Sequence, residues 1–315
     1  MKRLSVTAVL LCFVATVFAQ ELNVGSVNIR YGVKGDYKKH NGWVERRDYM
    51  CSLLNHERFD IFGAQEVLKS QLDDMLERMP EYGYVGVARD DGAEKGEFSP
   101  IFYNKSRVKM LKSGTFWLSE TPEEVSKGWD GLCRRVCTWG LFQDKITKAK
   151  FYHFNTHLDH RGKVAQVEGA KLILAKIAEL CPKGANIIIT GDFNVMQGSE
   201  TYNVLAQSGQ FKDCYEATKY RFAPTGTFNG FNPSCYTSSR IDHIFVTEGL
   251  KVNRYGVLTY HYYRDINATQ REMETSAPVE VKGEDREVKC VSDHYFVQAW
   301  ITLAGGKKIT STENL

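Results

Sequence analysis

Short apolar runs recur along the chain from residue 22 to residue 303, and most have the length of a strand rather than a helix. Helical patterns fall between some of these runs, and several pairs of runs have no helix between them. This succession predicts an α/β fold of two packed sheets with helices outside. The expected strands are residues 22–29, 61–64, 82–87, 99–103, 108–116, 138–143, 150–156, 186–190, 240–246, 252–258 and 295–303, and the expected helices are residues 46–55, 70–79 and 163–180.

The composition agrees with a soluble globular protein, since 43% of the 315 residues are hydrophobic and 25% are charged. It excludes collagen-like, coiled-coil and disordered chains, and a chain of this length buries a sizeable core without disulfide staples. No linker separates two halves, so we expect one domain over residues 20–304 and a C-terminal tail at residues 305–315. The polar residues 264–289 predict a long loop or a ragged hairpin.

The N-terminal segment has the layout of a secretory signal peptide. Lys2 and Arg3 form a positive start, residues 4–18 are mostly apolar, and small residues precede a cleavage point after Ala19. A buried strand or a membrane anchor is the alternative, but an anchor needs about 20 apolar residues. No later segment is long and apolar enough to span a bilayer. We therefore expect export to the periplasm or the extracellular space.

Removal of residues 1–19 lowers the formal net charge from +3 to +1 and leaves seven cysteines. A nucleic-acid-binding surface is usually far more basic, so the charge permits a nucleic-acid partner without favouring one. An odd number of cysteines cannot all pair within one chain, and their scattered spacing predicts no particular disulfide. Cys133 and Cys137 lack a nearby partner pair for zinc, so ordinary buried thiols are expected.

Polar side chains cluster at the ends of several apolar runs, where they would emerge at the edge of a sheet. Taken singly, each cluster is equally consistent with an ordinary turn. His157 could be only a hydrogen-bonded histidine, and Arg240 and Asp242 could form a surface charge pair. Taken together, they would offer oxygen ligands for Mg²⁺ and donors for a phosphoryl group. The clusters are Asn28, Gln65 with Glu66, and residues 155–159, 191–194, 240–243 and 292–294.

In this order, the motifs NIR (28–30), QE (65–66), NTHL (155–158), GDFN (191–194), RIDH (240–243) and SDH (292–294) resemble those of the endonuclease/exonuclease/phosphatase superfamily. These are the DNase I-like proteins, which include neutral sphingomyelinases and inositol polyphosphate phosphatases. The resemblance covers roughly residues 22–303, and the chain resembles exported bacterial members of the superfamily. It implies a four-layer α/β sandwich of two mostly antiparallel sheets, and a metal-dependent hydrolase of phosphate esters.

The resemblance also implies a role for each matching residue. Glu66 would be the principal ligand of Mg²⁺, with Mn²⁺ or Ca²⁺ as alternatives, and Asn28 and Asp293 would lie on the metal side. Asp192 would accept a proton from the attacking water or orient it, and Asn194 would fix that water or a phosphoryl oxygen. The remaining implied groups are His157, which would donate to a phosphate oxygen, and Asp242, which would hold the ring of His294 against the scissile phosphate.

One position departs from the pattern of many nuclease relatives, in which an Asn or Asp stands third in the first motif. Here Arg30 stands there and adds a cation near the expected site. Arg30 could grip a substrate phosphate with two hydrogen bonds, or it could pair with a neighbouring carboxylate. Both interpretations are kept.

Aromatic and arginine residues between positions 115 and 139 are one hint of a substrate, and the aromatic residues 260–263 could line a pocket rim or merely pack. Trp117 and Trp129 could stack on a base, a sugar or a lipid headgroup, whereas Trp139 and Phe116 are expected in the core. Arg134 and Arg135 alternate along an expected strand, so at most one of them faces a given surface.

Two functions are compatible with this sequence. The first is an exported, metal-dependent phosphoesterase, expected to be a monomer, that acts on nucleic acid, a phospholipid headgroup or a sugar or inositol phosphate. The second is a catalytically silent protein that binds a glycan or lipid through Trp117, Trp129 and Tyr262. All the polar residues of the motifs are present, which favours the enzyme.

Overall fold

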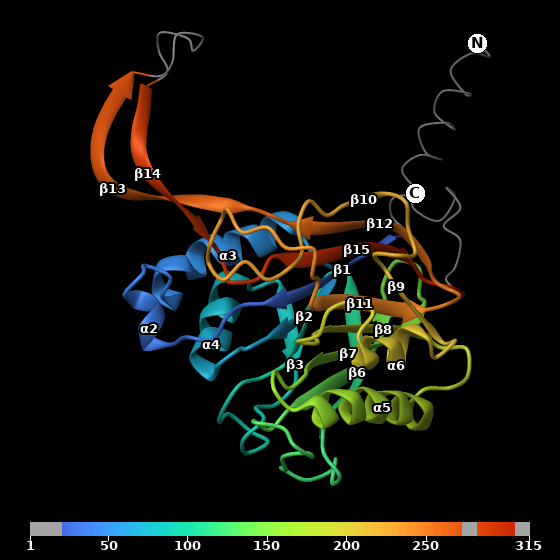
Figure 1. The fold of residues 1–315 in the computed structure, drawn as a ribbon. Coiled ribbons are helices and arrows are strands. Elements are labelled where there is room, and N and C mark those ends of the chain that lie inside the picture. Colours follow the sequence, from blue (N-terminus) through green and yellow to red (C-terminus); the bar gives the residue numbers. More distant parts are fainter. Residues whose placement is uncertain (1–20, 273–281, 306–315) are drawn as a thin grey trace, which may run out of the picture.

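A computed structural model describes residues 21–272 and 282–305 of the chain. The predicted signal peptide at residues 1–19 lies outside these residues, as does the predicted tail apart from its first residue. Two sheets pack face to face and helices cover both outer faces (Figure 1), so the predicted four-layer α/β sandwich is confirmed. Among the helices of the described ranges, none has the length and apolar character needed to cross a bilayer.

The first sheet has seven strands. Its strands, in spatial order, are β10 (Arg221–Phe222), β12 (Lys251–Leu258), β15 (Phe296–Thr302), β1 (Glu21–Asn28), β2 (Ile61–Gln65), β4 (Ile101–Asn104) and β3 (Tyr82–Val85). All neighbours are antiparallel except β10 with β12 and β1 with β2. The chain passes from β1 to β2 through helix α3 (Trp43–Glu57), which is the crossover that a parallel pair requires.

The second sheet has six strands and contains one parallel pair, β7 with β8, joined through helix α5 (Lys163–Leu180). Its strands, in spatial order, are β5 (Val108–Trp117), β6 (Val136–Asp144), β7 (Lys150–His157), β8 (Asn186–Asp192), β11 (Asp242–Thr247) and β9 (Phe211–Asp213). The antiparallel pairing of β6 with β7 agrees with the expectation for residues 138–143 and 150–156. Both sheets are therefore mostly antiparallel, as the resemblance implied.

Three apolar clusters fill the spaces between the layers. The central cluster draws on both sheets, with Val24 and Ile101 from the first and Phe151 and Ile188 from the second. A second cluster seals α3 and α4 onto the first sheet, and a third seals α5 and α6 onto the second. The helices are α2 (Lys34–Tyr37), α3 (Trp43–Glu57), α4 (Lys69–Arg78), α5 (Lys163–Leu180) and α6 (Glu200–Ala206).

The polar segment at residues 264–289 forms most of a two-stranded hairpin, β13 (His261–Glu272) with β14 (Lys282–Cys290), which projects from the body in Figure 1. Its register shifts between Asp265 and Gln270, so the hairpin is ragged as expected, and residues 273–281 lie outside the described part. The seven cysteines of the described residues are all unpaired.

Candidate active site

The register of the two parallel pairs brings four polar strand ends to one edge of the sandwich. Asn28 at the end of β1 is paired with Gln65 at the end of β2, and His157 at the end of β7 is paired with Asp192 at the end of β8. The antiparallel strand β11 begins at the same edge, because Asp242 is paired with Asp192. The six sequence clusters therefore converge, and the pleated alternation of side chains decides which members face each other.

A buried polar network beneath this edge ties the two sheets together. The Gln65 amide donates to Asn155 Oδ1 at 2.7 Å, and the Thr190 hydroxyl donates to the same oxygen at 3.0 Å. Asn155 in turn donates to the carbonyl of Ala64 at 2.7 Å. Every partner comes from the opposite sheet or a neighbouring strand, so this network fixes the two sheets relative to each other below the site.

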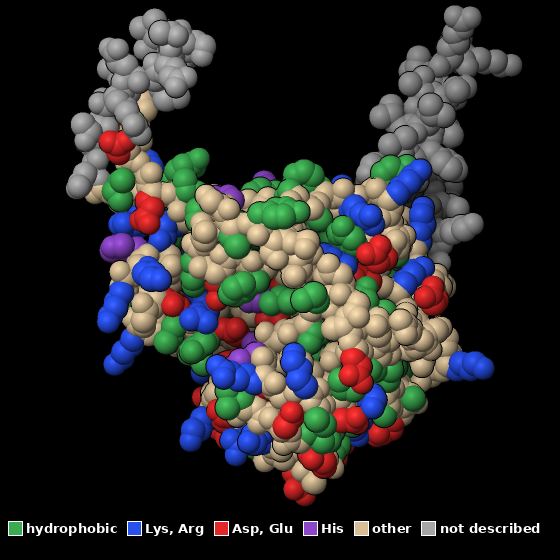
Figure 2. Space-filling model, viewed as in Figure 1, with side chains coloured by type: hydrophobic (Ala, Val, Ile, Leu, Met, Phe, Trp, Pro, Cys, Tyr) green, Lys and Arg blue, Asp and Glu red, His purple; other side chains and the backbone are tan. Residues whose placement is uncertain are grey.

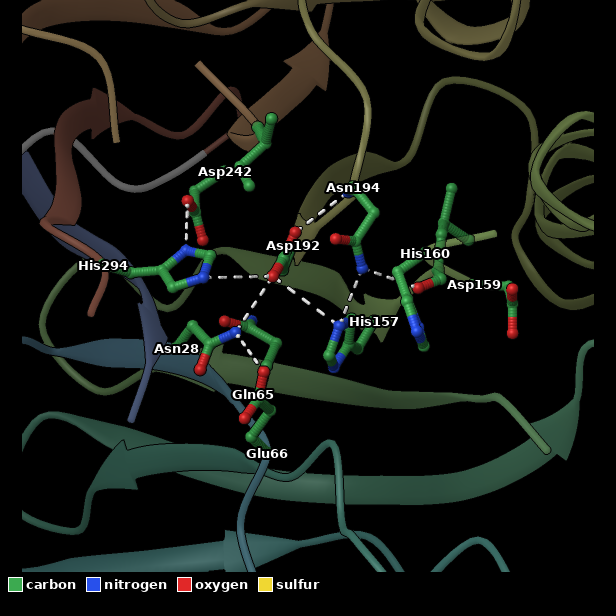
Figure 3. Close-up of polar contacts among 12 residues, drawn as sticks. Asn28, Gln65, Glu66, His157, Asp159, His160, Asp192, Asn194, Asp242 and His294 are labelled. Atoms are coloured by element: carbon green, nitrogen blue, oxygen red, sulfur yellow. Dashed lines mark hydrogen bonds and ion pairs between the residues drawn. The ribbon is translucent and has the colours of Figure 1, made fainter. Parts of the chain in front are cut away.

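Asp192 lies at the centre of the cluster, as Figure 3 shows. Its Oδ2 accepts a hydrogen bond from the Asn28 amide at 2.9 Å, and its Oδ1 accepts one from the backbone N–H of Asn194 at 2.9 Å. The Nε2 atoms of His157 and His294 flank Oδ2 at 3.6 Å and 3.7 Å. Burial, together with the nearby Asp242 carboxylate, raises the pKa of Asp192 to about 7.

The Asp242 carboxylate holds the ring of His294, as the resemblance implied. Asp242 Oδ2 lies 2.9 Å from His294 Nδ1, so this nitrogen carries a proton and Nε2 faces Asp192. Burial opposes a charge on the ring, but the carboxylates of Asp242 and Asp192 outweigh it and raise the pKa of His294 well above its usual range. The ring of His294 is thus a cation held next to Asp192.

His157 has different surroundings on the other side of Asp192. The Asn194 amide nitrogen lies 2.9 Å from His157 Nε2 and also donates to the carbonyl of Leu158 at 3.0 Å. Burial lowers the pKa of His157 well below its usual range, and the guanidinium groups of Arg135 and Arg89 lower it further. His157 is therefore a neutral ring beside the same carboxylate.

Glu66, Asn28 and Asp293 form the side of the site on which a metal was expected. The Asn28 amide donates to Glu66 Oε1 at 3.1 Å as well as to Asp192, so it joins the two carboxylates. Side-chain atoms of Glu66, His157 and Asp192 lie within 4.8 Å of one another, close enough to hold one ion. Burial and the nearby Glu66 carboxylate raise the pKa of Asp293. This crowding of acidic oxygens fits a divalent cation.

Three site residues that are not glycine adopt left-handed backbone conformations. Arg30, Glu66 and Asn194 have φ values of 59°, 62° and 52°. Such conformations are unfavourable for residues with a Cβ and persist where the surrounding structure fixes them, often at functional sites. Here each one turns the chain immediately after a strand end and presents its side chain at the edge of the sandwich.

A cavity of about 660 Å³ opens over Asp192, and Figure 2 shows acidic, basic and histidine side chains gathered in a hollow in the middle of this face. It contains residues that the sequence argument did not assign, notably Arg89, Glu97, Arg135 and His160. Its walls are formed by Arg30, Tyr31, Glu66, Arg89, Glu97, Cys133, Arg135, His157, His160, Asp192, Asn194, Phe228, Ile241, Asp293 and His294.

Arg30 lines this cavity but is held by carboxylates of the protein. Its Nε lies 3.0 Å from Asp36 Oδ2 and its Nη1 lies 3.6 Å from Asp293 Oδ2. The second interpretation of Arg30, a salt bridge to neighbouring carboxylates, is therefore the one that the geometry favours. Arg240 is not part of a surface pair with Asp242. It is buried and pairs with Asp213 at 2.9 Å, because Asp242 is taken by His294.

The aromatic residues expected at the substrate do not line the cavity. Trp117 is 7% exposed and its indole N–H donates to the backbone carbonyl of Arg89 at 2.8 Å, so a stacking role does not fit its position. Trp129 is half-buried and lies outside the cavity wall. Tyr262 is buried and stacks on Tyr49 with ring centroids 4.0 Å apart. The three residues of the alternative binding protein thus form no common surface.

The cavity residues that the sequence argument did not assign had only weak signals in the sequence. Arg135 stood in the pair with Arg134, and only Arg135 is buried while Arg134 is exposed, although both precede β6 (Val136–Asp144) and do not lie on the strand that was expected. His160 follows the NTHL motif directly. Arg89 and Glu97 sit in a loop between β3 and β4 that carried no motif, and only the folded chain brings them to the cavity.

The layered fold and a polar site at the strand ends together define a DNase I-like protein, and sequence comparison agrees. The model of the endonuclease/exonuclease/phosphatase family matches residues 25–294, and the chain belongs to this family. Its members are hydrolases that act on phosphate esters.

Among solved structures, a mannosyl-6-phosphatase from Bacteroides thetaiotaomicron VPI-5482 is 42% identical, with a TM-score of 0.80 over 89% of this chain and 99% of that one. A family protein from Bacteroides vulgatus is 33% identical, with a TM-score of 0.75 over 90% of this chain and 99% of that one. An uncharacterized protein (L388) of Acanthamoeba polyphaga mimivirus is 25% identical over 256 residues, which are 76% of this chain and 93% of the relative.

Proposed function

We propose that this chain is an exported phosphoesterase that hydrolyses a phosphate ester by attack of water, assisted by a divalent metal ion. The observation that carries the proposal is the placement of Asp192 between an Asp-bound, cationic His294 and a neutral His157 paired with Asn194. A carboxylate that can take a proton, next to a fixed cation, is suited to activating water and stabilising charge on a phosphoryl group. Membership of the family supports the reaction class.

The donors on the acidic side of the site fit a bound Mg²⁺ or Mn²⁺ ion. Glu66 would be its main ligand, with Asn28 and Asp293 next to it, since oxygen ligands are those that hard divalent cations prefer. When bound, such an ion would neutralise charge on the phosphoryl oxygens. The protein's own groups do the rest: Asp192 accepts the proton of the water, Asn194 orients it, and His294 stabilises charge on the phosphate.

The similarity to a mannosyl-6-phosphatase supports sugar phosphates as the first substrates to test with this chain. A phosphate on a sugar is small and exposed enough to enter a cavity of about 660 Å³. A long nucleic-acid duplex fits less well, because the chain without residues 1–19 has a net charge of only +1 and such binding depends on many cations.

Hydrolysis is tested with the chain from residue 20 onward, assayed on mannose 6-phosphate, p-nitrophenyl phosphate and bis-p-nitrophenyl phosphate with and without MgCl₂. We expect turnover of at least one substrate, complete loss in EDTA, and recovery when the metal is restored. Asp192→Asn keeps the size of the side chain and should lower kcat by about 10³-fold or more. Asp73→Asn is the control, because Asp73 is an exposed carboxylate paired with Lys69 on α4. Activity that persists in EDTA would contradict metal assistance.

Export is supported by the charged start, apolar run and small residues within positions 1–19. Expression of the full chain in a bacterial host should yield a mature protein in the periplasmic or extracellular fraction, beginning at or near Gln20 by N-terminal sequencing. A protein that keeps Met1 and stays in the cytoplasm would contradict export.

A further inference from the structure

One wall of the cavity holds a buried arginine without adequate partners. The side chain of Arg135 is 6% exposed, and its Nε and Nη1 have no hydrogen-bond partner in the protein. A guanidinium group cannot lose its proton in a protein, so burying it without partners is costly. Only its Nη2 is engaged, 3.1 Å from His160 Nδ1.

A second buried arginine shows how this chain satisfies such a group when its role is structural. Arg46 is fully buried, yet it donates to four backbone carbonyls. They belong to Asn41, Ile29, Val291 and Arg30. Arg46 lies outside the cavity wall, whereas Arg135 is part of it. Unlike Arg46, Arg135 thus has two buried nitrogens without a hydrogen-bond partner at the cavity wall.

The carboxylates nearest to Arg135 are already occupied. Asp159 Oδ2 lies 3.8 Å from Arg135 Nε, beyond hydrogen-bond distance, and accepts the backbone N–H groups of Leu132 and Cys133. Its other oxygen accepts backbone N–H groups from the loop before α5. Glu97 is bound through both oxygens by Arg89, at 2.8 Å each. Both carboxylates favour the charge of Arg135 from a distance, but neither accepts a hydrogen bond from it.

Arg89 adds a second cation to the same wall. Its Nε is also buried without a partner, and the indole N–H of Trp117 fixes its backbone at 2.8 Å. Two guanidinium groups next to each other repel. Burial is the main cause of the lowered pKa of Arg135, and the nearby charge of Arg89 lowers it further. A wall that keeps two cations together beside a phosphate-ester site is arranged for an anion.

We propose that Arg135, assisted by Arg89, binds the peripheral oxygens of a terminal phosphate and makes this chain selective for phosphomonoesters over phosphodiesters. The inference rests on the proposed phosphoesterase function and names the substrate class. A monoester carries close to two negative charges and three free oxygens near neutral pH, whereas a diester carries one charge and two free oxygens. The extra oxygen is what a guanidinium with two unpartnered nitrogens would recognise.

The binding test uses inorganic phosphate in the presence of EDTA, so that neither turnover nor metal contributes. Thermal unfolding is followed for the wild type, for Arg135→Met and for Arg134→Met, at constant ionic strength set with chloride. Arg134 is the matched control, an exposed neighbour whose Nη1 lies 3.6 Å from Asp90. We expect phosphate to raise the Tm of the wild type and of Arg134→Met but not of Arg135→Met. Without phosphate, Arg135→Met should melt at or above the wild-type temperature, because it removes an unpartnered buried charge.

The kinetic test compares p-nitrophenyl phosphate with bis-p-nitrophenyl phosphate. Arg135→Met should lower kcat/KM for the monoester by about 10- to 100-fold, the usual effect of losing hydrogen bonds to a charged group. The change should appear mainly in KM, and the diester should lose less than about threefold. Equal losses on both substrates, or a phosphate-induced Tm shift that Arg135→Met retains, would overturn the inference. A wild type that hydrolyses neither ester but keeps an Arg135-dependent Tm shift would refute the proposed function instead.

Discussion

His294 and His157 present Nε2 to the same oxygen of Asp192, at 3.7 Å and 3.6 Å, yet their environments are opposite. Behind His294 stands the carboxylate of Asp242, 2.9 Å away. Burial and the guanidinium groups of Arg135 and Arg89 lower the pKa of His157, whereas the carboxylates around His294 raise its pKa. The shared carboxylate helps to keep His294 charged but is not sufficient to charge His157. The other groups around each ring make the difference.

This difference gives the cavity two halves with separate tasks. The half around His294 supplies a fixed positive charge close to the carboxylate that would take a proton from water. The half around His157 keeps its histidine neutral and supplies cations farther out, through Arg135 and Arg89. A site built in this way places its cations on both sides of a bound phosphate without placing two charged rings against Asp192.

The largest expected effect comes from removing the two rings separately. His294→Ala should lower kcat by about 10³- to 10⁴-fold, because it removes the cation next to Asp192. His157→Ala should cost only about 10- to 100-fold, because a neutral ring contributes orientation rather than charge. Steady-state kinetics on one phosphate ester measure both. Equal losses would mean that the two halves do not differ in function.

The next effect comes from Asp242. Asp242→Asn keeps a side chain of the same size but removes the negative charge behind His294, and an amide nitrogen facing Nδ1 would favour the wrong tautomer. We expect kcat to fall by about 10²-fold or more while KM changes little. Asp213→Asn is not a suitable control, since Asp213 holds the buried Arg240. Asp91→Asn, on an exposed loop, is suitable.

A smaller effect is expected in the polar network that both halves rest on. A Cβ at Gly63 would collide with Asn155 Oδ1 and Thr190 Oγ1, which lie between the sheets. Gly63→Ala should therefore lower the free energy of unfolding by about 1–3 kcal/mol, measured by denaturant titration. Gly249→Ala is the control, because a Cβ there meets no atom within 4 Å. A Gly63→Ala protein as stable as the control would show that the two sheets can separate without cost.

The smallest effect concerns a third histidine, which has no charged partner. His153 is buried, its Nε2 lies 2.8 Å from Thr190 Oγ1, and burial lowers its pKa to about 3. The unfolded chain protonates this ring below about pH 6.5, whereas the folded chain does so only near pH 3. Stability from this residue is therefore lost as the pH falls from about 6.5 toward 3.

His153→Gln should flatten the pH dependence of the free energy of unfolding between pH 4 and 6.5 by up to about 1.4 kcal/mol per pH unit. Denaturant titrations at several pH values measure the slope. His56→Gln is the comparison, because His56 lies on the exposed side of α3. An unchanged slope in His153→Gln would show that this ring is not the source of the dependence.

The sequence was sufficient for the layers and for the polar residues at strand ends, because both follow from local periodicity and from the order of short motifs. It could not foresee the short strands β9 and β10, since two or three residues show no period. It also failed to predict that Trp117 is buried and that Arg240 pairs with Asp213. Whether an aromatic ring meets solvent, or which carboxylate an arginine reaches, depends on packing between segments distant in the chain.

The last strand of the first sheet lies at its centre, since β15 pairs with β1 on one side and β12 on the other. Just before it, the Ser292 hydroxyl donates to the carbonyl of Asn28 at 2.7 Å, across 264 positions of sequence. A growing chain therefore cannot complete this sheet until residues 296–302 have been made. Folding that waits for contacts so distant in sequence is slow. As a consequence, the candidate site is assembled only after residues 292–302 have been made, and a chain that stops short of β15 should lack a formed site.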